Sequence, residues 1–139
     1  MKAFFEQIAK DNGWYFSYGK NEFHNLDETE KPFSLYLDAV EEDIVHSEFN
    51  NITGHFFKSR IMLLKKSDLD EVYDSQCDND PAKGRYEAHI KPCKQQAEQF
   101  IDALTCEGYS IKKWQITEVI NAWDENCDGI IIYFSVEKL

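Results

Sequence analysis

Residues 114–136 read WQITEVINAWDENCDGIIIYFSV, and this stretch decides the fold. Apolar side chains recur at nearly every second position at both of its ends, which is the pattern of strands with one buried face. The polar segment between the two runs finishes in Asp128-Gly129, a pair that favours the tight turn of a β-hairpin. The stretch therefore predicts that Ile111–Trp123 and Ile130–Glu137 pair as antiparallel strands.

A helix is expected immediately before this hairpin. Pro92 suits the first turn of a helix, where the N–H that proline lacks would have no partner. Gly108 suits its end. Five side chains between them follow at i, i+4, i+7, i+8 and i+11 and form one apolar stripe: Cys93, Ala97, Phe100, Ile101 and Leu104. We expect residues 93–107 to pack through this stripe on the sheet.

The first half of the chain predicts a further helix and three strands. The helix covers Lys2–Asn12 and ends at Gly13, and the strands are Trp14–Tyr18, Phe33–Ala39 and Gly54–Lys66. Both faces of the last strand are partly apolar, which favours a central position in the sheet. The acidic residues Glu41-Glu42-Asp43 and the following Asn50-Asn51 indicate a loop.

This order of elements predicts one α+β domain over residues 1–139. Neighbouring strands joined by short or moderate loops give a mostly antiparallel sheet of four to five strands, with two helices packed on one face.

Composition and charge exclude several classes of protein. The 139 residues carry a formal net charge of −11 and are 42% hydrophobic, too apolar for a disordered acidic chain. A pI near 4.7 argues against binding nucleic acid by phosphate neutralisation. No apolar run approaches the length of a membrane span, and the early Glu6 does not fit a signal peptide. Residues 1–80 hold 17 acidic and 8 basic side chains, a net of −9, so we expect one acidic surface from this half.

The four cysteines predict neither a zinc site nor disulfides. Cys77, Cys93, Cys106 and Cys127 are separated by 16, 13 and 21 positions, without the close pairs that zinc sites use. The histidines are equally scattered along the chain. We expect free thiols that are mostly buried.

The segment 124–129 matches the first half of a calcium-binding EF-hand loop. Asp124, Asn126 and Asp128 would supply oxygen ligands, and Gly129 would make the turn. The twelfth position, however, is Ser135 where the loop requires a bidentate glutamate. A strand pattern also follows where a helix is needed, so we expect a turn without calcium.

No other motif predicts chemistry. The acidic residues from Asp68 to Asp80 are typical of a solvated loop, and no nucleophile, base and orienting group can be assembled from the spacing. The aromatic run Trp14–Tyr18 suits either a ligand-stacking platform or core filling, of which core filling is favoured. We therefore predict no catalytic, cofactor-binding or metal-binding residue, and no enzyme.

Three stretches together resemble a known group of proteins. They are NGWYFSYG at 12–19, LLKKSDLD at 63–70 and VINAWDENCDGI at 119–130, and they are similar to small structural proteins of tailed bacteriophages and prophages, the tail-terminator or head–tail joining group. The resemblance implies an α+β virion subunit that closes into a ring between the tail and the head or neck. Its partners would be copies of itself, tail-tube proteins and neck or connector proteins. DNA would be only passing cargo, no membrane would be involved and no active site would be expected.

A second class of function remains open on the sequence alone. Small size, strong acidity and free cysteines also suit a cytosolic immunity or inhibitor protein that masks a basic toxin or nuclease. A ring-forming subunit should show oligomers at high concentration, whereas an immunity protein is typically a monomer or dimer.

Overall fold

The computed structural model describes residues 1–19, 33–66, 86–122 and 127–138. The expected α+β class is confirmed: two α-helices pack against a mostly antiparallel sheet, which has six strands where four to five were expected. The elements in chain order are α1 (Lys2–Asn12), β1 (Tyr15–Tyr18), β2 (Ser34–Leu37), β3 (Glu41–His46), β4 (Ile52–Lys66), a π-helical turn (Tyr86–Ile90), α3 (Lys91–Cys106), β5 (Tyr109–Ala122) and β6 (Cys127–Lys138).

The long strand β4 organises the sheet. The strand order is β1-β2-β4-β6-β5. Strand β3 also pairs with β4, along residues 52–58, whereas β2 pairs with residues 61–64 of β4. The predicted central position of this strand is therefore confirmed. The pair β1–β2 is parallel and all other pairs are antiparallel, including the predicted hairpin of β5 and β6.

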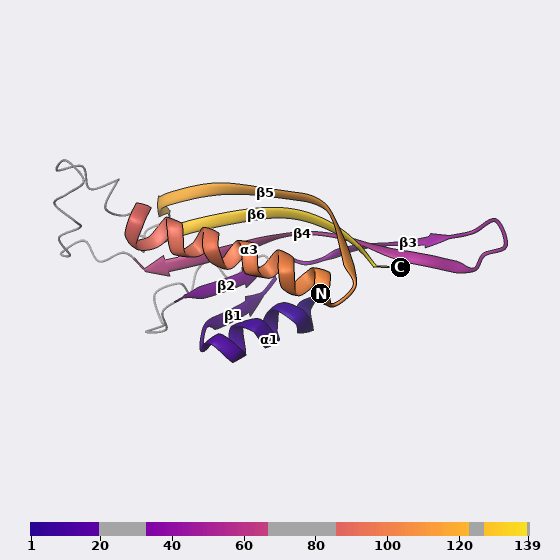
Figure 1. Ribbon diagram of the computed structural model, residues 1–139, viewed down its shortest axis with the longest axis horizontal. Coiled ribbons are helices and arrows are strands. Elements are labelled where there is room, and N and C mark those ends of the chain that lie inside the picture. The colour runs from indigo at the N-terminus through magenta and orange to yellow at the C-terminus, as the bar shows by residue number, and fades with distance from the viewer. Residues whose placement is uncertain (20–32, 67–85, 123–126, 139) are drawn as a thin grey trace.

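Both helices cover one face of the sheet and close the core (Figure 1). Helix α3 buries Cys93, Ala97, Phe100 and Leu104, which confirms four of the five expected stripe positions, while Ile101 is only partly buried. Helix α1 buries Phe5, whose ring lies 5.9 Å from that of Phe100. Gly13 ends α1 in the left-handed conformation, at φ 71°, which glycine adopts at little cost.

The opposite face of the sheet, here called the second face, carries a smaller apolar cluster. Tyr36, Met62, Leu64 and Cys127 are buried there, and Ile131 packs against them. Alternation along β4 therefore places Ile61 and Leu63 in the core under the helices and Met62 and Leu64 on the second face. This explains why both faces of the strand are partly apolar.

The prediction of a loop at the acidic residues 41–43 is wrong. Residues Glu41–His46 form strand β3, all six of them exposed, and pair with Ile52–Lys58 of β4. Residues 47–51 connect the two strands, with Asn50 at φ 62°. Figure 1 shows that this hairpin projects beyond the rest of the sheet. We call residues 41–56 the arm.

The prediction of a turn at Asp128-Gly129 is also wrong. Both residues lie inside β6, and the connection to β5, residues 123–126, falls outside the described residues. Gly129 has another role, because a Cβ atom there would lie 2.1 Å from the carbonyl oxygen of Leu63. Glycine is required here by the close approach of β6 to β4.

Candidate functional site

In the described part of the calcium-like segment, Asp128 pairs with a histidine. The carboxylate of Asp128 is completely buried, and its Oδ2 lies 2.7 Å from Nδ1 of His89, which is also buried. Ser135, at the expected twelfth loop position, is buried in β6. Asp124 and Asn126 lie outside the described residues. Asp128 thus connects the last strand to the turn that precedes α3.

Cys93 follows His89 by four positions, one helical turn, a spacing that is visible in the sequence although the histidines were interpreted as scattered. Burial raises the pKa of the Cys93 thiol to about 12, the nearby Asp128 charge raises it further, and Lys65 opposes the shift. The sulfur is therefore protonated near neutral pH and is not a nucleophile. His89, Cys93 and Asp128 therefore lie in the interior and do not form an accessible catalytic group.

The cysteines and the aromatic run agree with their predictions where the structure describes them. Cys93 and Cys127 are buried and Cys106 is exposed, and all three are free thiols, while Cys77 lies outside the described residues. Core filling by the aromatic run is confirmed for Trp14, whose ring lies 6.1 Å from that of Phe100. Within the described residues no group of three or more histidine, cysteine or acidic side chains is arranged to hold a metal ion.

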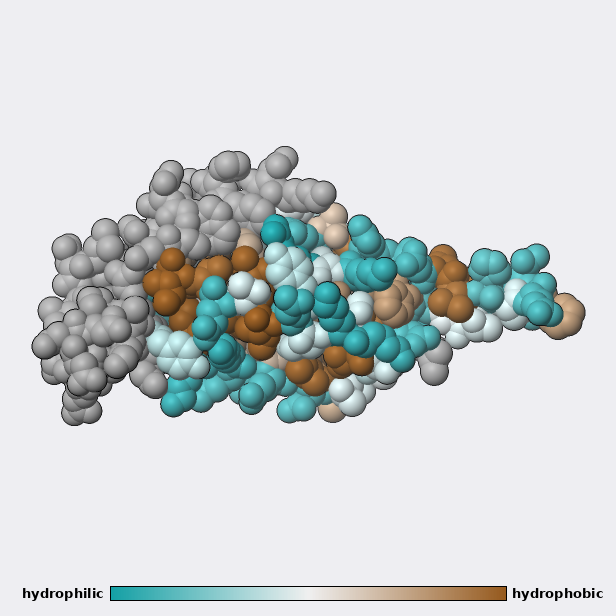
Figure 2. All heavy atoms as spheres, turned by 90° about the horizontal axis from the view of Figure 1, so that it is seen from above, coloured by the Kyte–Doolittle hydropathy of each residue, from teal (hydrophilic) through white to brown (hydrophobic). Residues whose placement is uncertain are grey.

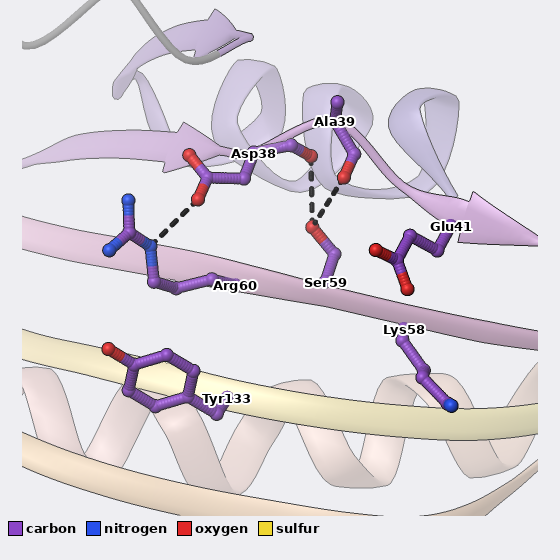
Figure 3. Close-up of a pocket in the computed structure, with 7 residues that line it drawn as sticks. All are labelled: Asp38, Ala39, Glu41, Lys58, Ser59, Arg60 and Tyr133. Carbon is purple, nitrogen blue, oxygen red and sulfur yellow. Dashed lines mark hydrogen bonds and ion pairs between the residues drawn. The ribbon is translucent and has the colours of Figure 1, made fainter.

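A polar hollow of about 430 Å³ lies where the chain leaves β2 and enters the arm (Figure 3). Arg60 donates a hydrogen bond from Nε to Oδ2 of Asp38 over 2.7 Å, and the Ser59 hydroxyl donates to the Asp38 carbonyl over 2.9 Å. Burial alone would lower the pKa of Arg60, but hydrogen bonds with Asp38 and Tyr133 raise it, so the guanidinium stays charged. These hydrogen bonds therefore hold the base of the arm to the sheet.

A row of charged and polar side chains crosses the second face beside this hollow. Pairing aligns Glu41 with Lys58, Lys58 with Ser135, and Ser135 with Lys113, so these four residues occupy one row across β3, β4, β6 and β5. Figure 3 shows the Lys58 side chain extending from β4 toward β6. In this acidic chain the row brings two exposed lysines onto one face.

The arm carries most of the exposed large apolar side chains in the described part of the chain. Phe49 at its tip is 84% exposed, Ile52 is 62% exposed and Ile44 is 52% exposed, and Val45 is also exposed. Figure 2 shows apolar residues among hydrophilic ones along this projection. Such a concentration on a projecting hairpin is typical of a surface that contacts another protein.

The sequence motifs gave no sign of this surface. Residues 41–51 of the arm were assigned to a loop because β3 buries no side chain and so has no buried-face periodicity to detect. Neither described helix has the length and apolar character needed to cross a membrane. No family model and no curated protein matches this sequence.

Proposed function

We propose that this chain is a non-catalytic structural subunit of a tailed bacteriophage or prophage virion, which associates side by side into a ring at the junction of tail and head. The observation that carries the proposal is the arm, a projecting hairpin with exposed apolar side chains from Ile44 to Ile52. A contact with a neighbouring subunit would remove this apolar surface from water, at roughly 25 cal/mol for each Å² covered.

The chemistry of the described residues supports a structural role. The thiol of Cys93 is buried and protonated, and the His89–Asp128 pair is buried beside it. In the polar hollow at the base of the arm, Arg60 is bound to Asp38. A subunit of this kind acts through its edges and projections.

The acidic surface suits the same role. Glu41, Glu42 and Asp43 are exposed on β3, and the second acidic segment, Asp68–Asp80, lies outside the described residues. Negative charge on a ring prevents DNA from adhering to it during passage. The remaining partners in this proposal are tail-tube proteins and neck or connector proteins.

Gene deletion in a phage that encodes the chain tests the proposal. We expect the deletion mutant to yield no normal DNA-filled, tailed particles, and the wild-type gene supplied in trans to restore them. The matched pair of rescue genes carries Phe49→Ser at the arm tip or Gln99→Ser on the exposed side of α3, and only Gln99→Ser should rescue fully. Normal virions after deletion would overturn the structural proposal and favour the immunity-protein alternative.

A further inference from the structure

A second hollow, here called the basic hollow, opens on the second face and measures about 380 Å³. Both helices lie on the other side of the sheet, so neither covers it (Figure 1). It adjoins the polar hollow at the base of the arm, because three residues line both. The lining residues of the basic hollow are Lys58, Ser59, Lys113, Tyr133, Phe134 and Ser135.

Two lysines of the basic hollow have no carboxylate partner. Lys58 on β4 and Lys113 on β5 both pair with Ser135 of β6, so they flank this serine from its two sides. Both lysines are exposed, and neither forms an ion pair within the described part of the chain. Glu41 lies across from Lys58 on β3, but the lysine side chain extends away from it toward β6 (Figure 3).

The carboxylates beside the two hollows are already paired with other cations. Asp38 lies 2.7 Å from Nε of Arg60, and Glu137 lies 2.9 Å from Nζ of Lys112. The basic hollow therefore presents positive charge to a partner, although the chain as a whole has a net charge of −11.

The arm tip carries the complementary chemistry. Glu48 and Phe49 are adjacent and exposed there, and Glu48 forms no ion pair within the described residues. The tip thus offers a carboxylate beside an aromatic ring. The basic hollow offers two ammonium groups beside the exposed ring of Tyr133. Both an opposite-charge contact and an aromatic contact can form between these surfaces.

The tip cannot reach the basic hollow of its own chain. Ile52, next to the tip, and Lys58 lie six positions apart on the single extended strand β4, which separates them by about 20 Å. Pairing with β3 along this length keeps the arm extended, and the arm projects away from the body (Figure 1). The tip and the hollow can therefore meet only when they belong to different chains.

We propose that the arm tip of one subunit docks in the basic hollow of a second copy of this chain, with Glu48 between Lys58 and Lys113 and Phe49 against Tyr133. The contact joins two different surfaces, so repetition produces a ring when the rotation per subunit closes and a filament when it does not. This inference rests on the proposed self-associating function and specifies the interface that carries it.

Charge exchange between the tip and the hollow tests the docking. The two variants are Lys113→Glu in the hollow and Glu48→Lys at the tip. Sedimentation of the full chain over a wide concentration range should show association of the wild type. The dissociation constant of each variant alone should be on the order of tenfold weaker. An equimolar mixture should associate again, because the unchanged tip of one variant fits the unchanged hollow of the other, and the introduced lysine meets the introduced glutamate.

The salt concentration of this experiment matters because every copy is acidic. In about 0.15 M salt the Debye length is about 8 Å, so repulsion between the distant charges of two subunits is largely screened, while charges in direct contact are screened less. The measurement is therefore made at this ionic strength.

Matched variants with the same change of charge control for net charge. Lys10→Glu on α1 and Glu98→Lys on α3 alter exposed residues away from the tip and the basic hollow, and both should associate like the wild type. Circular dichroism verifies that every variant is folded.

The outcomes separate the two proposals. Wild-type association that neither variant weakens more than its matched control overturns the docking and leaves the ring-subunit proposal standing. A mixture that associates no better than the separate variants also overturns it, as does a wild type that stays monomeric throughout. The gene deletion described above then decides the ring-subunit proposal independently.

Discussion

Strand β4 passes through two regions of opposite character. Its residues Ile61 to Leu64 are at most 1% exposed and lie between the helix-covered core and the second-face cluster. Its first residue, Ile52, is 62% exposed on the arm. Both regions are hydrogen-bonded strand, so backbone pairing alone does not distinguish them. The difference shows that the body stabilises the fold by burial, whereas the arm leaves large apolar side chains exposed.

The largest effect is expected in the helix-covered core. Leu104 is completely buried on α3, and Leu104→Asp places an unpaired charge there, which should reduce the free energy of unfolding by about 4 kcal/mol or more. Urea denaturation measures this loss, with Gln99→Asp on the exposed side of the same helix as control. Because Leu104→Asp risks not folding at all, Leu104→Ala, at about 2–5 kcal/mol, provides a second measurement. A stable Leu104→Asp protein would show that α3 does not cover the core.

The next effect tests the close contact between β4 and β6. Gly129→Ala inserts a methyl group against the backbone of Leu63, and because backbone has little room to shift, we expect a loss of about 1–3 kcal/mol. The matched change is Gly108→Ala, at φ 87° with open space around its Cβ position, which meets only backbone strain of about 1 kcal/mol. Equal losses from the two variants would contradict the close approach of these strands.

A smaller effect concerns the buried thiol of Cys93. Its pKa in the folded protein is raised to about 12 from an ordinary value of 9.0, so the folded state holds this proton more tightly than the unfolded state does. The associated stability is complete below pH 9 and is lost as the pH rises toward 12. Cys93→Ala should therefore lose less stability than the wild type between these pH values, as measured by thermal unfolding. Parallel pH profiles of the two proteins would contradict the burial of the thiol.

The smallest effect on stability is expected at the arm tip. Phe49 is 84% exposed, so Phe49→Ser should change the free energy of unfolding by no more than about 0.5 kcal/mol. The same substitution should reduce association at high protein concentration, measured by sedimentation. A large loss of stability would show that the arm packs on its own body, and would remove the contrast between the two regions.

The sequence predicted the elements whose side chains divide clearly between inside and outside. The hairpin of β5 and β6 and the stripe on α3 were identified because burial of one face imposes a periodicity on the residues. Strand β3 escaped detection because all six of its residues are exposed. Asp128-Gly129 was misinterpreted because a local turn preference was outweighed by the contact of Gly129 with β4, which only the tertiary structure contains.

The candidate surfaces were less predictable still. The pair His89–Asp128 joins residues 39 positions apart, and no spacing rule identifies such a contact. The exposed apolar side chains of the arm likewise gather only because β3 pairs with the first part of β4.

The position of β6 has a consequence for how the chain acquires its structure. Although β6 is the last of the described elements in the chain, it lies between β4 and β5 in the sheet. During synthesis β6, the partner of β4, therefore leaves the ribosome more than 60 residues after β4 does, since Lys66 pairs with Cys127 and Ile61 with Ile132. Pairing at such separation is slow, because the intervening chain must be ordered first. The apolar second half of β4 thus remains exposed in the nascent chain, and folding is completed only after β6 has been released.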